Sequence, residues 1–68
     1  MKIITANSMD GGKLLGYARQ TIAGLWYVFT LTPAGVIENH EPIIAMDEAT
    51  ARRKLSFLLG NIDLIAVD

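Results

Sequence analysis

The sequence predicts an α+β fold, in which a small, mainly antiparallel β-meander carries one helix on one face. Residues 25–32 are rich in β-prone side chains and have one wholly apolar side. Residues 47–60 contain a helix start signal and a helix stop signal. Turn-forming glycine and proline residues separate the other β-prone segments. The expected element order is therefore β-β-β-β-α-β.

The chain has 68 residues, and we expect residues 1–68 to form one domain around one core. It contains no Cys, which excludes disulfides within this chain and Cys-based zinc sites. Hydrophobic residues make up 51% of the sequence, too large a share for a disordered chain. The stability of so small a domain must then come from good packing, from oligomerisation, or from both.

Charge and hydropathy exclude several classes of protein. The formal net charge is −1, whereas nucleic-acid-binding domains usually carry a basic excess. No apolar run approaches the ~18 residues of a membrane-spanning helix, so no membrane partner is expected. Residues 1–5 lack the apolar stretch of a signal peptide. We therefore expect a soluble, cytoplasmic protein.

Residues 25–32 are expected to form the central strand. Their odd-numbered side is wholly apolar, and we expect it beneath the helix. Their even-numbered side begins with Trp26 and Val28 and becomes polar, so we expect that face to be partly exposed. Strands one and two are expected at residues 2–6 and 13–22, joined by a glycine-rich loop.

The loop between strand two and the central strand can close in two ways. A two-residue loop, 23–24, places small residues of strand two beside large ones such as Phe29. A three-residue loop, 22–24, suits the glycine better but moves Tyr17 and Arg19 onto that apolar face. A shift of one residue exchanges the two faces of the strand. We favour the two-residue loop.

The next turn, residues 32–35, has Pro and Gly at the positions that a β-turn prefers. It predicts a fourth strand at residues 36–41, ended by Pro42. The expected cross-strand pairs are Leu31 with Ile37, Thr30 with Glu38, and Val28 with His40. Residues 43–46 are expected to form an apolar crossover.

The helix is expected to begin after Asp47, a good N-cap, and to end at Gly60. Its apolar stripe consists of Ala51, Leu55, Leu58 and Leu59. Residues 62–67 predict a last strand that is apolar on both sides and can pair with strand one or with another chain. Because one helix covers only one face of a sheet, we expect a second chain to cover the remaining apolar surface.

Phe57 points away from the apolar stripe of the helix, toward Thr50, Arg53 and Asn61. Phe57 can then either pack under the crossover or the C-terminus, or contact another chain. On the second sheet face, Trp26 lies near Arg19 in the two-residue register, and the two either form a cation–π pair or anchor an interface. Further candidates lie on the last strand. The predicted interface residues are Trp26, Val28, Arg53, Phe57, Ile65 and Val67.

We expect no catalytic, cofactor-binding or metal site. Glu38 and His40 share a strand face, but two ligands do not make a metal site, and charged residues commonly protect strand edges. Ser8, Asp10 and His40 include the residue types of a hydrolase triad, but no pattern brings them together. Residues 10–13 are rich in glycine but precede a strand, whereas a phosphate loop precedes a helix.

An aromatic central strand followed by a helix resembles the AP2-type and integrase arm-binding domains. The matching residues are 25–28, Gly35, 48–49 and 51–52. The resemblance covers about half of the chain and implies DNA binding through the exposed sheet face. Those families load that face with Arg and Lys, whereas the expected face of this chain has one base, Arg19.

The first functional hypothesis is a non-enzymatic protein-interaction module that acts as a homo-oligomer, most simply a homodimer. It would work as an adaptor or as an inhibitor by surface occlusion. A short acidic chain without catalytic motifs is typical of accessory proteins of phages and mobile elements. The alternative hypothesis is a nucleic-acid-binding domain. Its candidate residues are Lys13, Arg19, Arg52 and Arg53.

Overall fold

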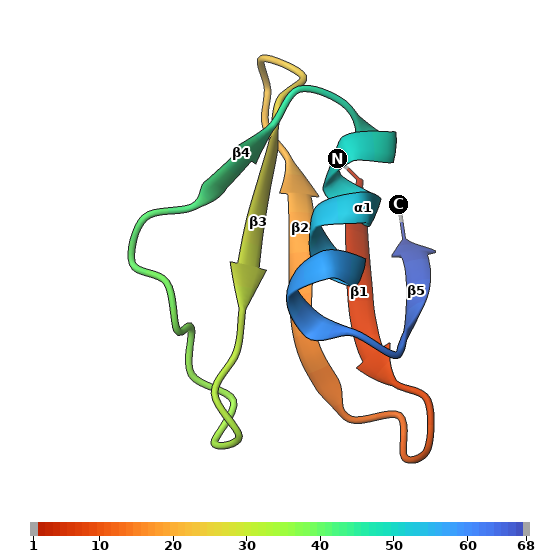
Figure 1. The fold of residues 1–68 in the computed structure, drawn as a ribbon. Helices are drawn as coiled ribbons and strands as arrows, with labels where there is room; N and C mark the ends of the chain where they lie inside the picture. The colour runs from red at the N-terminus through yellow and green to blue at the C-terminus, as the bar shows by residue number, and fades with distance from the viewer. Residues whose placement is uncertain (1, 68) are drawn as a thin grey trace.

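A computed structural model describes residues 2–67, which form one five-stranded sheet and one helix (Figure 1). The elements are β1 (Ile3–Ser8), β2 (Leu14–Gln20), β3 (Trp26–Thr30), β4 (Ile43–Ala45), α1 (Glu48–Leu59) and β5 (Ile62–Val67). The strands lie in the order β4-β3-β2-β1-β5, and all neighbours are antiparallel. The helix therefore carries the chain from one edge of the meander to the other. The predicted α+β class is confirmed.

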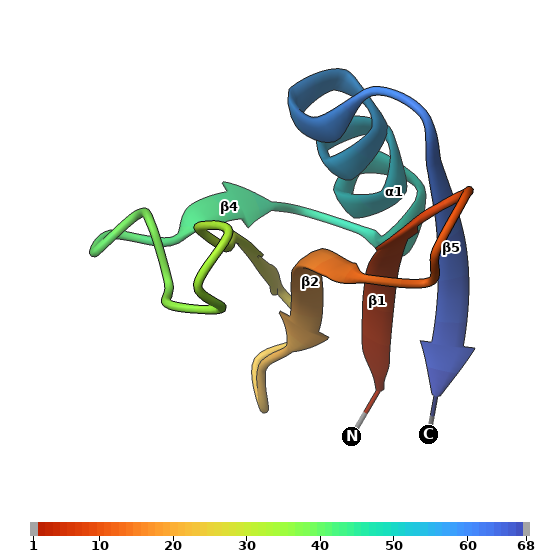
Figure 2. The same cartoon turned by 90° about the horizontal axis from the view of Figure 1, so that it is seen from below.

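The hydrophobic core lies between α1 and one face of the sheet (Figure 2). Ile4, Ala18, Val28 and Ile43 are cross-strand neighbours, so they lie in one row on the helix side. Trp26 and Leu55 are among the largest fully buried side chains. The buried cluster consists of Ile4, Ala6, Ala18, Trp26, Val28, Ala45, Ala51 and Leu55.

The prediction that the odd-numbered side of residues 25–32 lies beneath the helix was wrong. The helix covers the even-numbered side, where Trp26 is only 2% exposed. The physical reason is the size of the neighbours, since this side of the sheet carries small residues such as Ala6, Gly16 and Ala18. At Gly16 an added Cβ would lie 2.9 Å from Leu59 Cδ1, which shows how closely the helix approaches.

The preferred two-residue loop between β2 and β3 was also wrong. Gln20 pairs with Trp26, which corresponds to the three-residue loop 22–24. The Thr21 N–H donates to Leu25 O at 2.7 Å, and the Gly24 N–H donates to Thr21 O at 3.0 Å. Gly24 has φ of 88°, a left-handed conformation that favours glycine. This requirement of the turn sets the register of the hairpin.

The turn at residues 32–35 is confirmed, because the Gly35 N–H donates to Thr32 O at 2.8 Å. The predicted bridge between Leu31 and Ile37 is confirmed as well. The predicted pair of Thr30 with Glu38 is also confirmed, since the Glu38 N–H donates to Thr30 O at 2.8 Å. Residues 36–41 nevertheless do not form the predicted strand, and the fourth strand is β4. Val28 pairs with Ile43 of β4, not with His40. The segment read as an apolar crossover is therefore the edge strand.

The helix has the predicted boundaries. The Thr50 N–H donates to the Asp47 carboxylate at 2.7 Å, and Gly60 ends the helix with φ of 78°. Ala51 and Leu55 of the predicted stripe are buried in the core. The last strand, β5, pairs with β1 along its whole length. No helix within residues 2–67 is long and apolar enough to cross a membrane.

Candidate interaction surfaces

The face of the sheet opposite α1 has no helix or strand over it in the described part of the chain (Figure 2). The register places one row of side chains across all five strands of this face: Val67, Ile3, Arg19, Tyr27 and Ile44. A second row contains Ile65, Thr5, Tyr17 and Phe29. We call these two rows the open sheet face.

Aromatic contacts organise the centre of the open sheet face. The Arg19 guanidinium carbon lies 5.2 Å from the centroid of the Tyr27 ring, within the range of a cation–π interaction. The Tyr17 and Phe29 ring centroids are also 5.2 Å apart, with the rings tilted by 30°. The aliphatic side chains around them are about half exposed, for example Ile44 at 54%. Arg19 is the one charged side chain in these two rows.

The open sheet face ends at β5, whose outer backbone edge has no partner strand within residues 2–67. The Gln20 N–H donates to Lys2 O. The backbone N–H and C=O groups of the even-numbered residues of β1 therefore point toward β2, and those of its odd-numbered residues point toward β5. On β5, the backbone groups of Ile65 consequently point toward β1, whereas those of Leu64 and Ala66 point away from the sheet at its edge. An unpaired edge of this kind can accept another strand.

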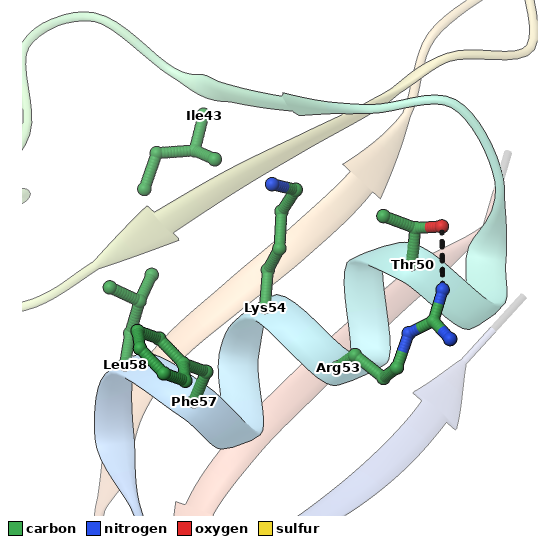
Figure 3. A pocket seen from close by; sticks show the side chains of 6 residues that line it. All are labelled: Ile43, Thr50, Arg53, Lys54, Phe57 and Leu58. Atoms are coloured by element: carbon green, nitrogen blue, oxygen red, sulfur yellow. Dashed lines mark hydrogen bonds between the residues drawn. The ribbon is translucent and has the colours of Figure 1, made fainter.

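A second candidate surface is a groove of about 520 Å³ between α1 and β4 (Figure 3). Ile43 of β4 lies on one side, and the remaining residues come from the outer flank of the helix. The lining residues are Ile43, Thr50, Arg53, Lys54, Phe57 and Leu58. We call this surface the helix groove. Phe57 is 89% exposed there, so its ring is available to another molecule.

The predicted interface residues separate into three places. Trp26 and Val28 lie in the core, where a second chain cannot reach them, and this part of the prediction is wrong. The physical reason is the corrected sheet face described above. Phe57 and Arg53 line the helix groove, together with the predicted neighbour Thr50. Ile65 and Val67 belong to the open sheet face.

The residues of the predicted nucleic-acid site are not brought together. Arg19 lies on the open sheet face, stacked on Tyr27 rather than on the predicted Trp26. Arg52 lies on α1, across the sheet, where its Nε is 3.1 Å from a Glu48 carboxylate oxygen. Arg53 lines the helix groove, and Lys13 lies in the loop between β1 and β2. These four cations therefore do not form one patch.

Sequence reasoning missed the aromatic centre of the open sheet face. Tyr27 was assigned to the buried side, because the residue pattern of 25–32 is apolar on both sides at its start. The favoured two-residue loop placed Tyr17 and Arg19 on the other face, apart from Tyr27, whereas Tyr17 pairs with Phe29 and Arg19 with Tyr27. The signal that identifies the correct side is Gly24, whose left-handed turn requires the three-residue loop. That register places Arg19 directly opposite Tyr27.

The side chains of Glu38 and His40, which were expected to share a strand face, differ in their surroundings. Glu38 accepts a hydrogen bond from the Thr30 hydroxyl at 3.0 Å, and His40 is exposed. Within residues 2–67, no three His, Cys, Asp or Glu side chains are grouped closely enough to hold a metal ion.

Comparison of the chain with protein-family models, curated proteins and solved structures finds no match.

Proposed function

We propose that this protein is a non-enzymatic interaction module that associates with a second copy of itself through the open sheet face. The observation that carries this proposal is the row Val67, Ile3, Tyr27 and Ile44, interrupted only by Arg19. A half-exposed and largely apolar surface on a small domain is typical of a protein contact. Two such faces can pack against each other as the two layers of a β-sandwich do.

The energetic argument starts from the size of the core. The buried cluster has four alanines among its eight members, so it removes little apolar surface from water. Covering Ile3, Ile44, Ile65 and Val67 with a second sheet would add to that burial at ~25 cal/mol per Å². Self-association is thus a direct way to stabilise a domain that contains neither a disulfide nor a Cys-based metal site.

Arg19 limits this association and gives it a salt dependence. In a symmetric dimer each copy contributes one guanidinium to the interface, and the two positive charges repel each other. The Tyr27 ring attracts the guanidinium through its quadrupole but does not neutralise the positive charge. The dimer should therefore tighten as ionic strength rises. Replacing Arg19 with Met should tighten it further.

The test is the molar mass in solution, measured by light scattering over a dilution series. We expect a mass that is a multiple of 7.4 kDa. Ile44→Lys and Val67→Lys should each lower the mass to that of the monomer. The matched control is Ile22→Lys, because Ile22 is 99% exposed in a loop outside both candidate surfaces. A mass of 7.4 kDa at all concentrations would refute self-association.

A further variant distinguishes face packing from edge pairing. The Ala66 N–H points away from β1, so Ala66→Pro removes only a donor that an added strand would use. The sheet-face proposal expects Ala66→Pro to leave the mass unchanged. If Ala66→Pro gives monomers while Ile44→Lys does not, the copies associate through the β5 edge instead.

A second candidate function uses the same face for single-stranded nucleic acid. Tyr17, Tyr27 and Arg19 lie together there, and aromatic side chains beside a cation can stack on bases. This function expects binding that weakens steeply with salt and is lost in Arg19→Met. Self-association expects the opposite response to both changes. One salt titration with one variant therefore separates the two functions.

The proposed module would act as an adaptor or as an inhibitor that occludes a surface, in the manner of a phage or mobile-element accessory protein. We place it in the cytoplasm, because a chain without Cys gains no disulfides from an oxidising compartment. Expression of a tagged copy followed by cell fractionation tests this location. Recovery of the protein in the membrane or exported fraction would contradict it.

A further inference from the structure

We propose that the helix groove binds an acidic, apolar segment of a partner protein. This binding would use the side of the sheet opposite the self-association face, so it goes beyond the function proposed above. A module with a self-associating face and a separate groove could hold two copies of the same partner segment at once.

The apolar part of the proposal rests on Phe57 and its two neighbours. Phe57 is 89% exposed, although Leu55, two residues earlier on the helix, is fully buried. Leu58 is partly exposed beside it, and Ile43 of β4 forms the opposite wall (Figure 3). An exposed aromatic side chain with aliphatic walls on both sides is the arrangement that anchors a partner side chain.

The acidic part of the proposal rests on the charges of the groove. Arg53 and Lys54 line it, and no acidic residue does. Within residues 2–67, the ion pairs join Lys2 and Arg52 to Glu48, and neither groove cation takes part. Arg53 donates from Nη2 to the neutral Thr50 Oγ1 at 3.4 Å, and the carboxylate that its charge influences, Asp47, lies outside the lining of the groove. Complementary charge on the partner must therefore be negative.

The form of the groove indicates an extended segment rather than an enclosed small molecule. Its volume of about 520 Å³ falls within the range of ligand sites. It opens sideways, because β4 is an edge strand with no further strand beyond it in the described chain. A peptide can run along this opening, place apolar side chains against Phe57 and Leu58, and direct carboxylates toward Arg53 and Lys54.

The experiment uses a fluorescent peptide of about eight residues in which Glu alternates with Leu and Phe, and a second peptide with Lys in place of Glu. Fluorescence anisotropy of the full chain should show binding of the acidic peptide and at least about tenfold weaker binding of the basic one. Phe57→Ser should weaken binding of the acidic peptide at least about tenfold. Because Phe57 contributes almost nothing to the core, the variant should retain the wild-type melting temperature.

Matched charge changes make the test specific. Arg53→Glu and Lys13→Glu alter the net charge equally, but Lys13 lies in the β1–β2 loop rather than in the groove. Only Arg53→Glu should weaken the binding of the acidic peptide. The double variant Arg53→Glu, Lys54→Glu should bind the basic peptide more tightly than the acidic one. Ile44→Lys should bind like the wild type, which separates this proposal from self-association.

Five results would overturn the proposal, four of them from the binding experiments. Those four are no binding of either peptide, equal binding of both, equal effects of Arg53→Glu and Lys13→Glu, and unchanged binding in Phe57→Ser. Loss of the dimer in Phe57→Ser would also overturn it, because the groove would then be occupied by a second copy of this chain.

Discussion

The side chain of Asn39 hydrogen-bonds to the backbone of Thr30, whose N–H donates to Asn39 Oδ1 at 2.9 Å. The Asn39 amide nitrogen donates to Val28 O at 3.1 Å and to Glu41 O at 3.0 Å. The backbone groups of Val28 and Thr30 point toward the β4 side of β3, and β4 begins only at Ile43. The Asn39 amide, together with the Glu38 N–H that donates to Thr30 O at 2.8 Å, thus satisfies the part of the β3 edge that β4 does not reach.

We expect Asn39→Ala to destabilise the protein by about 1–3 kcal/mol, because it leaves partly buried backbone groups of β3 without partners. Asn39→Asp should also destabilise, since a carboxylate cannot donate to Val28 O. His40→Ala is the control, because His40 is exposed. Urea denaturation measures all three. Equal stability of Asn39→Ala and His40→Ala would show that water replaces the amide without loss.

Gly16 should tolerate no side chain. A Cβ at Gly16 would lie 2.7 Å from Phe29 O and 2.9 Å from Leu59 Cδ1, so the backbone of β3 would have to move. We expect Gly16→Ala to cost about 1–3 kcal/mol of unfolding free energy, as overpacking of a core does. Gly11→Ala, whose nearest contact would be Ser8 Oγ at 3.7 Å, should cost much less. Thermal melts of both variants measure this difference in stability, and Gly16→Ala should melt at the lower temperature.

Trp26 should report the integrity of the core rather than of an interface. It is the only Trp and is 2% exposed, so its fluorescence should be blue-shifted in the native state and red-shifted on unfolding. Trp26→Ala should destabilise the chain by about 3–5 kcal/mol. A stable Trp26→Ala variant that differs from the wild type only in oligomeric mass would contradict the assignment of Trp26 to the core.

Asp47 should make the helix start sensitive to acid. Hydrogen bonds from the side chain and then the backbone N–H of Thr50, with a smaller effect of the Arg53 charge, lower the pKa of Asp47 below its usual 3.8. A carboxyl whose pKa is lower in the folded state stabilises the fold above its unfolded-state pKa, and this contribution disappears as pH falls through the folded-state pKa. The wild type should therefore melt at a higher temperature than Asp47→Ala near neutral pH.

Thermal melts of the wild type and Asp47→Ala across the acidic range give the measurement. The difference between the two melting temperatures should be constant above about pH 5 and shrink below the usual Asp value. Glu41→Ala is the control, because Glu41 uses its backbone carbonyl rather than its carboxylate in the hydrogen bonds described above. A difference that persists unchanged into strong acid would mean that Asp47 acts without its charge.

The candidate surfaces were only partly predictable. The position of Phe57 on the outer flank of the helix follows from helical periodicity, and the structure places it with Thr50 and Arg53 as expected. The places of Lys54 and Ile43 in this groove could not be predicted from the sequence, since the groove forms only where α1 lies beside β4. The open sheet face was assigned to the wrong side, so Tyr27 was missed and Trp26 was named in its place.

Local chemistry in the sequence determined the elements of this protein. Asp47 and Gly60 mark the ends of the helix and residues 32–35 form a turn, because each of these depends on neighbouring residues alone. The apolar pattern of residues 62–67 predicted a strand, but its pairing with β1 depends on residues distant in the sequence. Tertiary structure decided which side of β3 is buried, since a strand with Trp26 on one side and Phe29 on the other offers apolar surface to both. The helix packs on the side where small residues, Gly16 above all, allow it to approach the sheet closely.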